Sequence, residues 1–259
     1  MMIDHSVSPL LPGRREAIGS FLSAFVLVAL VREARAAPVR AEGGARRWIA
    51  GQAEIADGLA SGRLTGLQWA REVERLAAEV DVAELMALVR RSRIDPAGPA
   101  AHNDPSKRYV RFLDEAGGVR RLGYGAALFD FSPTNVITPH GHRHMVSAHL
   151  VVQGALRVRN FDRVGDEGEA MRLRPTRDYV ARVGQVSTMC SERDNIHWFV
   201  PQGGPAATFD VVVSGLEPGA PDHVIQAVDP LRAAPAADGT LLAPIIGFGE
   251  SSARYTANI

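Results

Sequence analysis

The stretch ITPHGHRHMVSAHLVVQGALRVRNF, residues 137–161, holds the strongest functional signal in this 259-residue chain. Its histidines occupy positions 140, 142, 144 and 149, and its apolar run closes at Gly154. Alternate residues of a β-strand point to one face of a sheet, so this spacing can aim two or three imidazoles at a common point. Imidazoles that converge in this way are typical metal ligands. The stretch therefore predicts a metal site built on a β-strand.

Short alternating runs continue the β pattern on both sides of this stretch. They are residues 108–113, 124–131, 149–152, 156–161, 185–190, 196–200 and 207–213. Strands this short and this numerous, without long helical patterns between them, are typical of an antiparallel barrel or sandwich. We therefore expect one β domain over residues 108–216.

Residues 44–94 have a helical period instead, because apolar residues recur there at spacings of three and four. Asp81 is the expected N-cap of one of these helices. The pattern predicts a small helical hairpin packed on the β domain or on a second subunit, so a homodimer stays open. Residues 95–107 contain prolines and a glycine and are expected to form a linker. Residues 217–259 are expected to form a C-terminal tail that packs partly on the barrel.

The charge balance and the cysteine content exclude several classes of protein. The chain has 29 basic and 29 acidic residues, so it carries no excess charge that would attract nucleic acid. Its partner is therefore expected to be a small molecule. Cys190 is the single cysteine, which rules out an internal disulfide and a thiolate-rich zinc cluster. A metal in this protein must be held by nitrogen and oxygen ligands.

The N-terminus has the features of a targeting segment. Arg14 and Arg15 precede the charge-free apolar residues 17–31, and Ala34-Arg35-Ala36 forms a small-x-small cleavage pattern. The paired arginines resemble a bacterial twin-arginine (Tat) export signal. We expect a signal peptide over residues 1–37, a periplasmic or secreted protein, and no stable membrane insertion after signal removal. An ordinary secretory signal and an uncleaved membrane anchor remain the alternatives.

The histidine motif resembles the first motif of the cupin superfamily. His140-x-His142 is followed at that motif's intervals by Ser147 and Gly154. The resemblance implies a mainly β fold, with a single cupin (jelly-roll) barrel preceded by the small α-helical segment. It also implies a third histidine from a later strand, for which His197 is the candidate. The metal ligands are thus expected to be His140, His142 and His197.

Ser147 stands where most metal-binding cupins have a glutamate ligand, and a serine is a poor ligand at neutral pH. A three-histidine set without glutamate, together with Gln153-Gly154, resembles the cysteine dioxygenase-like (thiol dioxygenase) branch. That resemblance favours Fe(II) as the one divalent metal, with zinc as the alternative. Four further residues are candidates for supporting or substrate-contacting roles: His149, Ser147, Arg157 and Arg159.

The expected function is a non-haem iron oxygenase that acts on a small thiol or a related metabolite. Two alternatives stay open. A zinc-type hydrolase or isomerase could use the same three histidines, since zinc lowers the pKa of a bound water. A non-catalytic periplasmic ligand-binding or sensing protein is favoured by the lack of an evident general acid or base beside the histidines.

Overall fold

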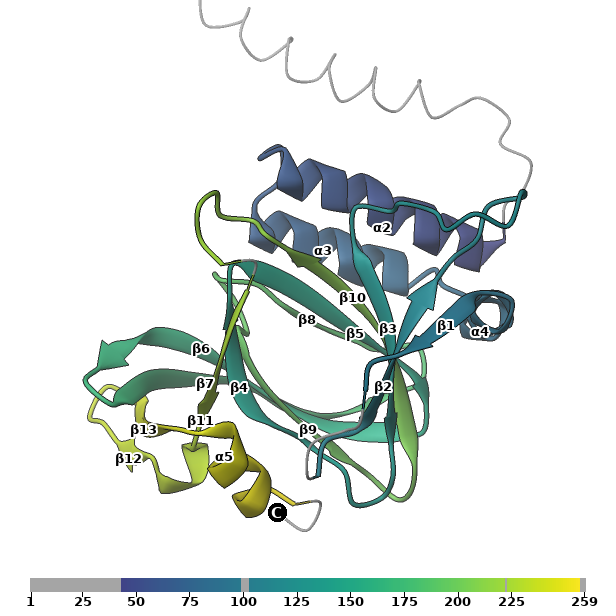
Figure 1. Cartoon of the computed structure of the whole chain (residues 1–259). Helices are drawn as coiled ribbons and strands as arrows, with labels where there is room; N and C mark the ends of the chain where they lie inside the picture. The colour runs from purple at the N-terminus through teal and green to yellow at the C-terminus, as the bar shows by residue number, and fades with distance from the viewer. Residues whose placement is uncertain (1–42, 99–102, 222, 257–259) are drawn as a thin grey trace, which may run out of the picture. The chain divides into compact units, whose positions relative to one another are not determined.

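The computed structural model describes residues 43–98, 103–221 and 223–256. The predicted signal peptide therefore lies outside the described residues. Two antiparallel sheets and a group of helices make up the described chain (Figure 1). Among the described residues, no helix is both long and apolar enough to cross a membrane.

The strands of the first sheet, in spatial order, are β1 (Arg93–Pro96), β2 (Ser106–Arg111), β3 (Gly125–Phe131), β10 (Ala206–Ser214), β5 (Met145–Gln153) and β8 (Val186–Met189). Those of the second are β11 (Val224–Val228), β4 (Ile137–Arg143), β9 (Ile196–Pro201), β6 (Ala155–Glu167), β7 (Ala170–Arg182), β13 (Leu241–Ile246) and β12 (Ala234–Pro235).

The order of strands β3 to β10 defines the topology. Four of them lie as β3-β10-β5-β8 in the first sheet, and the other four lie as β4-β9-β6-β7 in the second. Eight antiparallel strands divided between two sheets in this order form a jelly roll. The predicted fold class, a mainly β jelly roll preceded by a small helical segment, is confirmed.

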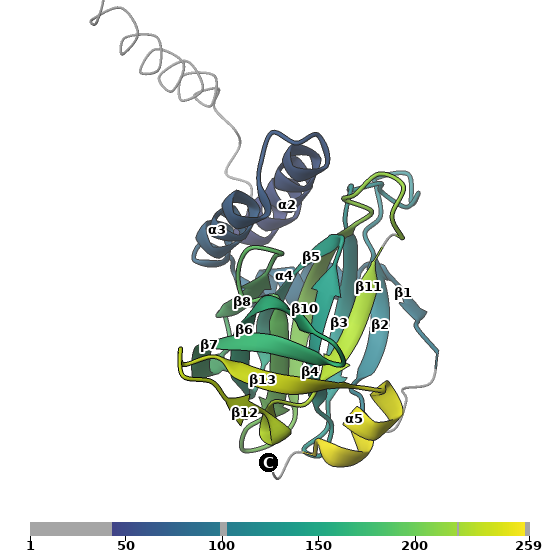
Figure 2. The same cartoon turned by 90° about the vertical axis from the view of Figure 1, so that its left-hand side faces the viewer.

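Three helices precede the sheets: α2 (Gly44–Ala60), α3 (Gly66–Ala77) and α4 (Val82–Arg90). Thr65 caps α3 in a capping box with Gln68, and the Asp81 side chain accepts from the Glu84 backbone N–H at the start of α4. The apolar faces of the helices form one buried cluster with side chains of β3, β5 and β10. The helices therefore cover the outer face of the first sheet (Figures 1 and 2).

The turn from β5 to β6 explains why a glycine follows the histidine motif. Gly154 has a φ of +68°, and a Cβ placed there would lie 2.4 Å from the carbonyl oxygen of Pro205. A side chain at this position would be strained and would also collide with backbone. Gly154 thus allows the tight turn by which the chain passes from β5 in the first sheet to β6 in the second.

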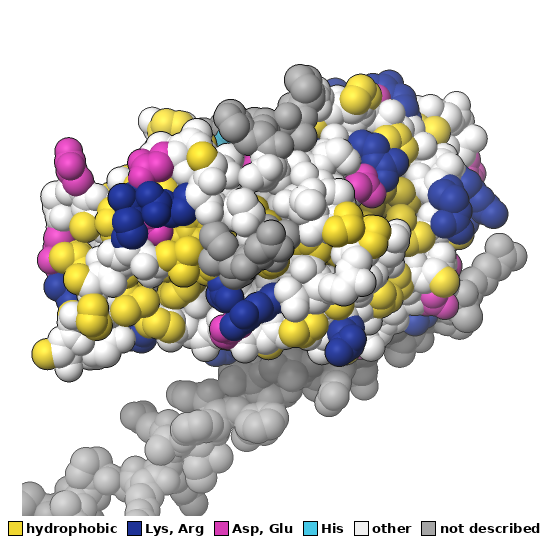
Figure 3. All heavy atoms as spheres, turned by 90° about the horizontal axis from the view of Figure 1, so that it is seen from below, with side chains coloured by type: hydrophobic (Ala, Val, Ile, Leu, Met, Phe, Trp, Pro, Cys, Tyr) yellow, Lys and Arg dark blue, Asp and Glu magenta, His cyan; other side chains and the backbone are white. Residues whose placement is uncertain are grey.

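The residues after position 216 contribute more regular structure than a tail. β11 pairs with β4, and β13 pairs with β7, so both extend the second sheet. The 3₁₀ helix η1 (Pro230–Arg232) and helix α5 (Phe248–Arg254) complete this region. On the face shown in Figure 3, basic, acidic and hydrophobic side chains are interspersed.

Candidate metal centre and its cavity

Strands β4 and β9 bring the three predicted ligands together. His140 lies directly opposite His197 in the antiparallel ladder, and His142 follows two residues later on the same face. The ladder register shifts between Ile137 and His140, around Pro139, which cannot donate to a ladder. A bulge moves the side chains that follow it to the opposite face. It is the reason that Ile137, His140 and His142 all line the cavity.

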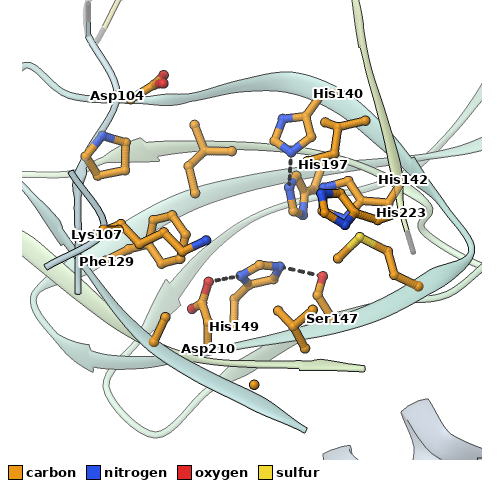
Figure 4. Close-up of a pocket in the computed structure, with 18 of the residues that line it drawn as sticks. Asp104, Lys107, Phe129, His140, His142, Ser147, His149, His197, Asp210 and His223 are labelled. Atoms are coloured by element: carbon orange, nitrogen blue, oxygen red, sulfur yellow. Dashed lines mark hydrogen bonds and ion pairs between the residues drawn. The ribbon is translucent and has the colours of Figure 1, made fainter. Parts of the chain in front are cut away.

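The imidazole nitrogens of the three histidines have the spacing of a ligand set. One ring nitrogen from each lies within 4.8 Å of the others, and His140 Nε2 and His197 Nε2 are 3.1 Å apart. Two nitrogens that bind one metal at about 2.1 Å lie roughly 3.0–3.4 Å apart for ordinary coordination angles. The cluster therefore suits a metal ion. Figure 4 shows the rings of His140, His142 and His197 gathered on one wall.

The protonation state of the cluster also fits a metal. Burial lowers the pKa of His140 to about 4, and it lowers the pKa values of His142 and His197 well below the usual value. Neutral imidazole is the form that binds metals. Both ring nitrogens of His142 and Nδ1 of His197 are buried without a hydrogen-bond partner among the described residues. Buried polar atoms that lack a partner are costly, and a metal would satisfy those that face the cluster.

A second group of polar side chains lines the cavity beside the histidine cluster. His149 Nδ1 is 2.7 Å from Asp210 Oδ2, and His149 Nε2 is 3.0 Å from Ser147 Oγ (Figure 4). Since a carboxylate only accepts, the Nδ1–H donates to Asp210 and Nε2 accepts from the Ser147 hydroxyl. The pair is buried, with Asp210 1% and His149 5% exposed. The rings of His149 and His197 are 4.7 Å apart, so this group adjoins the histidine cluster.

The cavity between the sheets has a volume of about 610 Å³. Besides the histidines, its walls include Lys107 on β2 and His223, which lies just before β11. The Lys107 ammonium lies 4.9 Å from the ring centre of Tyr109 and 5.4 Å from that of Phe129. The cavity thus combines three metal-ligand candidates, a cation on an aromatic wall, and a hydrogen-bonded Ser-His-Asp group.

Two residues predicted as supporting candidates lie elsewhere. Arg157 and Arg159 share one face of β6, but that face points out of the barrel. Arg157 forms an exposed ion pair with Asp178, and Arg159 stacks over the Trp198 ring at 3.9 Å. The cavity lining includes neither arginine. The prediction that they support the site is therefore corrected, because the neighbours of β6 bury Leu156 and Val158 instead.

His144 lies away from the cluster, and three residues that were not predicted line the cavity. His144 has a φ of +62° at the turn between β4 and β5, and its Nδ1 lies 2.5 Å from Glu217 Oε2, so it points away from the cluster. Sequence reasoning missed Asp210, Lys107 and His223 as residues of the cavity. Asp210 lies within a predicted strand, at a position that could face inward, whereas Lys107 lies at the end of the predicted linker. No local motif marks either residue.

No family model matches the chain, and no curated protein is significantly similar to it. Among solved structures, an oxalate oxidase matches with a TM-score of 0.33 and 23% identity, over 49% of this chain and 58% of that one. The chain thus spans less than two thirds of that protein's length. A cupin superfamily protein from Desulfitobacterium hafniense matches with a TM-score of 0.28 and 12% identity, over 45% of this chain and 83% of that one.

A protein with a double-stranded β-helix domain from Klebsiella pneumoniae matches with a TM-score of 0.31 and 14% identity, over 49% of this chain and 83% of that one. Likenesses of this size carry no functional information. The structure brings the three predicted ligands, His140, His142 and His197, together in one cluster. Metal binding by this cluster stays a prediction.

Proposed function

We propose that this protein is a metal-dependent enzyme, a non-haem iron oxygenase that oxidises a small thiol carrying a negative charge. The observation that carries the proposal is the convergence of three neutral imidazoles, His140, His142 and His197, on a cavity that also holds a His149–Asp210 pair. Fe(II) bound by the three imidazoles would offer open positions for a thiolate and for dioxygen.

The His149–Asp210 pair supplies the acid–base group that sequence reasoning did not find. Asp210 holds His149 in the tautomer whose Nε2 accepts a proton, and Ser147 donates its hydroxyl to that nitrogen. A proton leaving the substrate thiol can pass to the Ser147 oxygen while the serine proton moves to His149. The imidazolium formed is then stabilised by the buried Asp210 carboxylate. This group favours turnover over simple ligand capture.

Lys107 is the expected contact for the charged end of the substrate. Its half-buried side chain lies against Tyr109 and Phe129 and lines the same cavity as the histidines. A dication at the histidine cluster and an ammonium on the opposite side would together favour an anion between them. A small carboxylate that also carries a thiol matches both ends of the cavity.

Metal analysis and oxygen uptake test the proposal together. Anaerobically reconstituted protein should hold one iron per chain and consume oxygen with thiols that bear a carboxylate. A mercapto-carboxylate should be oxidised at least about tenfold more efficiently than its carboxamide, a difference of about 1.4 kcal/mol. Lys107→Met should remove that preference, because it removes the ammonium that would contact the carboxylate. Stoichiometric zinc without oxygen uptake would contradict the proposal and support hydrolysis. A thiol that binds and is recovered unchanged would support the ligand-binding alternative.

A further inference from the structure

We infer that Asn160 orients His197 for metal binding, by accepting a hydrogen bond from His197 Nδ1–H directly or through one water. The inference rests on the proposed metal site. The Nδ1 atoms of His140 and His197 differ in their surroundings. His140 has a backbone acceptor behind it, since its Nδ1 lies 2.7 Å from the carbonyl oxygen of Thr138. His197 Nδ1 is buried and has no partner among the described residues.

Asn160 lies where a partner for His197 is needed. It is the residue directly opposite His197 in the β6–β9 ladder. Directly opposite residues of an antiparallel pair project from the same face, with Cβ atoms about 4.5–5.5 Å apart. Asn160 is 1% exposed, and neither its Oδ1 nor its Nδ2 has a hydrogen-bond partner among the described residues.

These two buried groups are chemically complementary. Buried side-chain polar atoms are usually paired, and each atom left unpaired costs free energy. An amide offers both a donor and an acceptor, so rotation about its terminal bond matches either tautomer of the imidazole. When Asn160 Oδ1 accepts from Nδ1–H, the lone pair of His197 remains on Nε2. That atom faces His140 Nε2 at 3.1 Å, where a shared metal would be held.

The role is one of positioning, because Asn160 would act through His197 and would not touch the metal. Partners that hold the distal nitrogen of a ligand histidine typically contribute about 10–100-fold to metal affinity. Asn160→Leu removes both polar atoms and keeps the approximate volume, whereas Asn160→Asp keeps an acceptor. Thr208→Val is the matched control, since Thr208 is also fully buried on a strand of the barrel with its hydroxyl unpartnered.

Cobalt binding tests the inference without any assay of turnover. Co²⁺ is titrated against a competing chelator, and its visible spectrum reports the ligand geometry. We expect Asn160→Leu to weaken binding about 10–100-fold and to alter the spectrum, Asn160→Asp to stay within a few-fold of wild type, and Thr208→Val to bind as wild type does. If Asn160→Leu binds Co²⁺ with unchanged affinity and spectrum, the inference is wrong while the metal site stands.

A second measurement uses only the unmodified protein, in case Asn160→Leu does not fold. In the Zn²⁺-loaded protein, ¹H–¹⁵N spectra of the imidazole rings should show a His197 Nδ1–H proton that exchanges slowly with water. A rapidly exchanging proton there would overturn the inference. Failure of the unmodified protein to bind either Co²⁺ or Zn²⁺ would instead overturn the proposed metal site, and the role of Asn160 with it.

Discussion

Strand β5 presents Val146, Ala148 and Leu150 to the helices, and Ser147 and His149 to the cavity. The side chains of the outer set are all apolar, and they pack in one cluster with the apolar faces of α2, α3 and α4. The inner set is hydrogen-bonded across to Asp210 of β10. One strand therefore serves stability on one face and chemistry on the other, because its side chains alternate.

Strand β10 divides in the same way. Phe209 and Val211 join the helix-facing cluster, whereas Thr208 and Asp210 face inward. On that inner face, Thr208 Oγ1 and Asp210 Oδ1 lack partners among the described residues. Apolar burial contributes about 25 cal/mol per Å², whereas buried polar atoms without partners cost free energy. The helices stabilise the sheet from outside, which allows the inner face to hold polar groups that do not contribute to stability.

Truncation of a ligand on the inner face should have the largest effect. His197→Ala leaves two imidazoles of the cluster, so we expect metal affinity to fall by more than about 100-fold, beyond the range for loss of an outer partner. His144→Ala is the matched control, since His144 lies at the nearby turn and pairs with Glu217. Metal content after dialysis, measured by elemental analysis, distinguishes the two. Equal metal loss in both variants would place the metal elsewhere.

Truncation on the outer face should reverse the pattern. Leu150 is fully buried beneath the helices, so Leu150→Ala should lower the free energy of unfolding by about 2–5 kcal/mol. Metal affinity of the folded variant should stay within a few-fold of wild type. Urea denaturation of metal-free protein, followed by a metal titration in native buffer, measures both quantities. Weakened metal binding in this variant would show that the two faces are coupled.

The part of the site that could be predicted from the sequence is the part that depends on spacing within one strand. His140 and His142 lie within one strand, so their common face follows from an interval of two. Asp210 is 61 positions from His149, and only the β5–β10 register, which no local pattern specifies, makes them neighbours. Arg157 and Arg159 stayed candidates because alternation along a strand does not tell which of its faces is buried.

β7 was missed for a physical reason as well. Its middle, residues 174–178, is exposed and contains Pro175 and charged side chains. These residues give no apolar alternation, although the strand pairs along its whole length with β6. A segment with a proline, charged residues and no apolar alternation does not give the sequence signal of a strand.

Asp210→Asn tests whether the inner face performs acid–base chemistry. The amide keeps the shape of the side chain but cannot stabilise an imidazolium, so turnover of the thiol substrate should fall about 100-fold. Metal content should not change, because Asp210 contacts His149 and not the histidine cluster. Oxygen uptake at saturating substrate and metal analysis are measured on the same sample. Unchanged turnover with normal metal content would exclude the pair from the reaction.

The smallest expected effect is the pH dependence of the metal-free protein. Burial lowers the pKa of His140 to about 4 in the folded chain, against about 6.5 when unfolded. A lowered histidine pKa means that the unfolded state binds more protons, so this contribution to stability is present above pH 6.5 and is lost as the pH falls toward 4. Each kcal/mol lost lowers the melting temperature by about 2–4 °C in a domain of this size.

His140→Gln cannot titrate, so its melting temperature should change less between pH 6.5 and pH 4 than that of the wild type. The surface carboxylates are common to both proteins, so their contribution cancels in the difference. Identical pH profiles would mean that His140 is solvated in the metal-free protein. Water would then reach the inner face of the barrel, in contrast to the apolar cluster on the outer face.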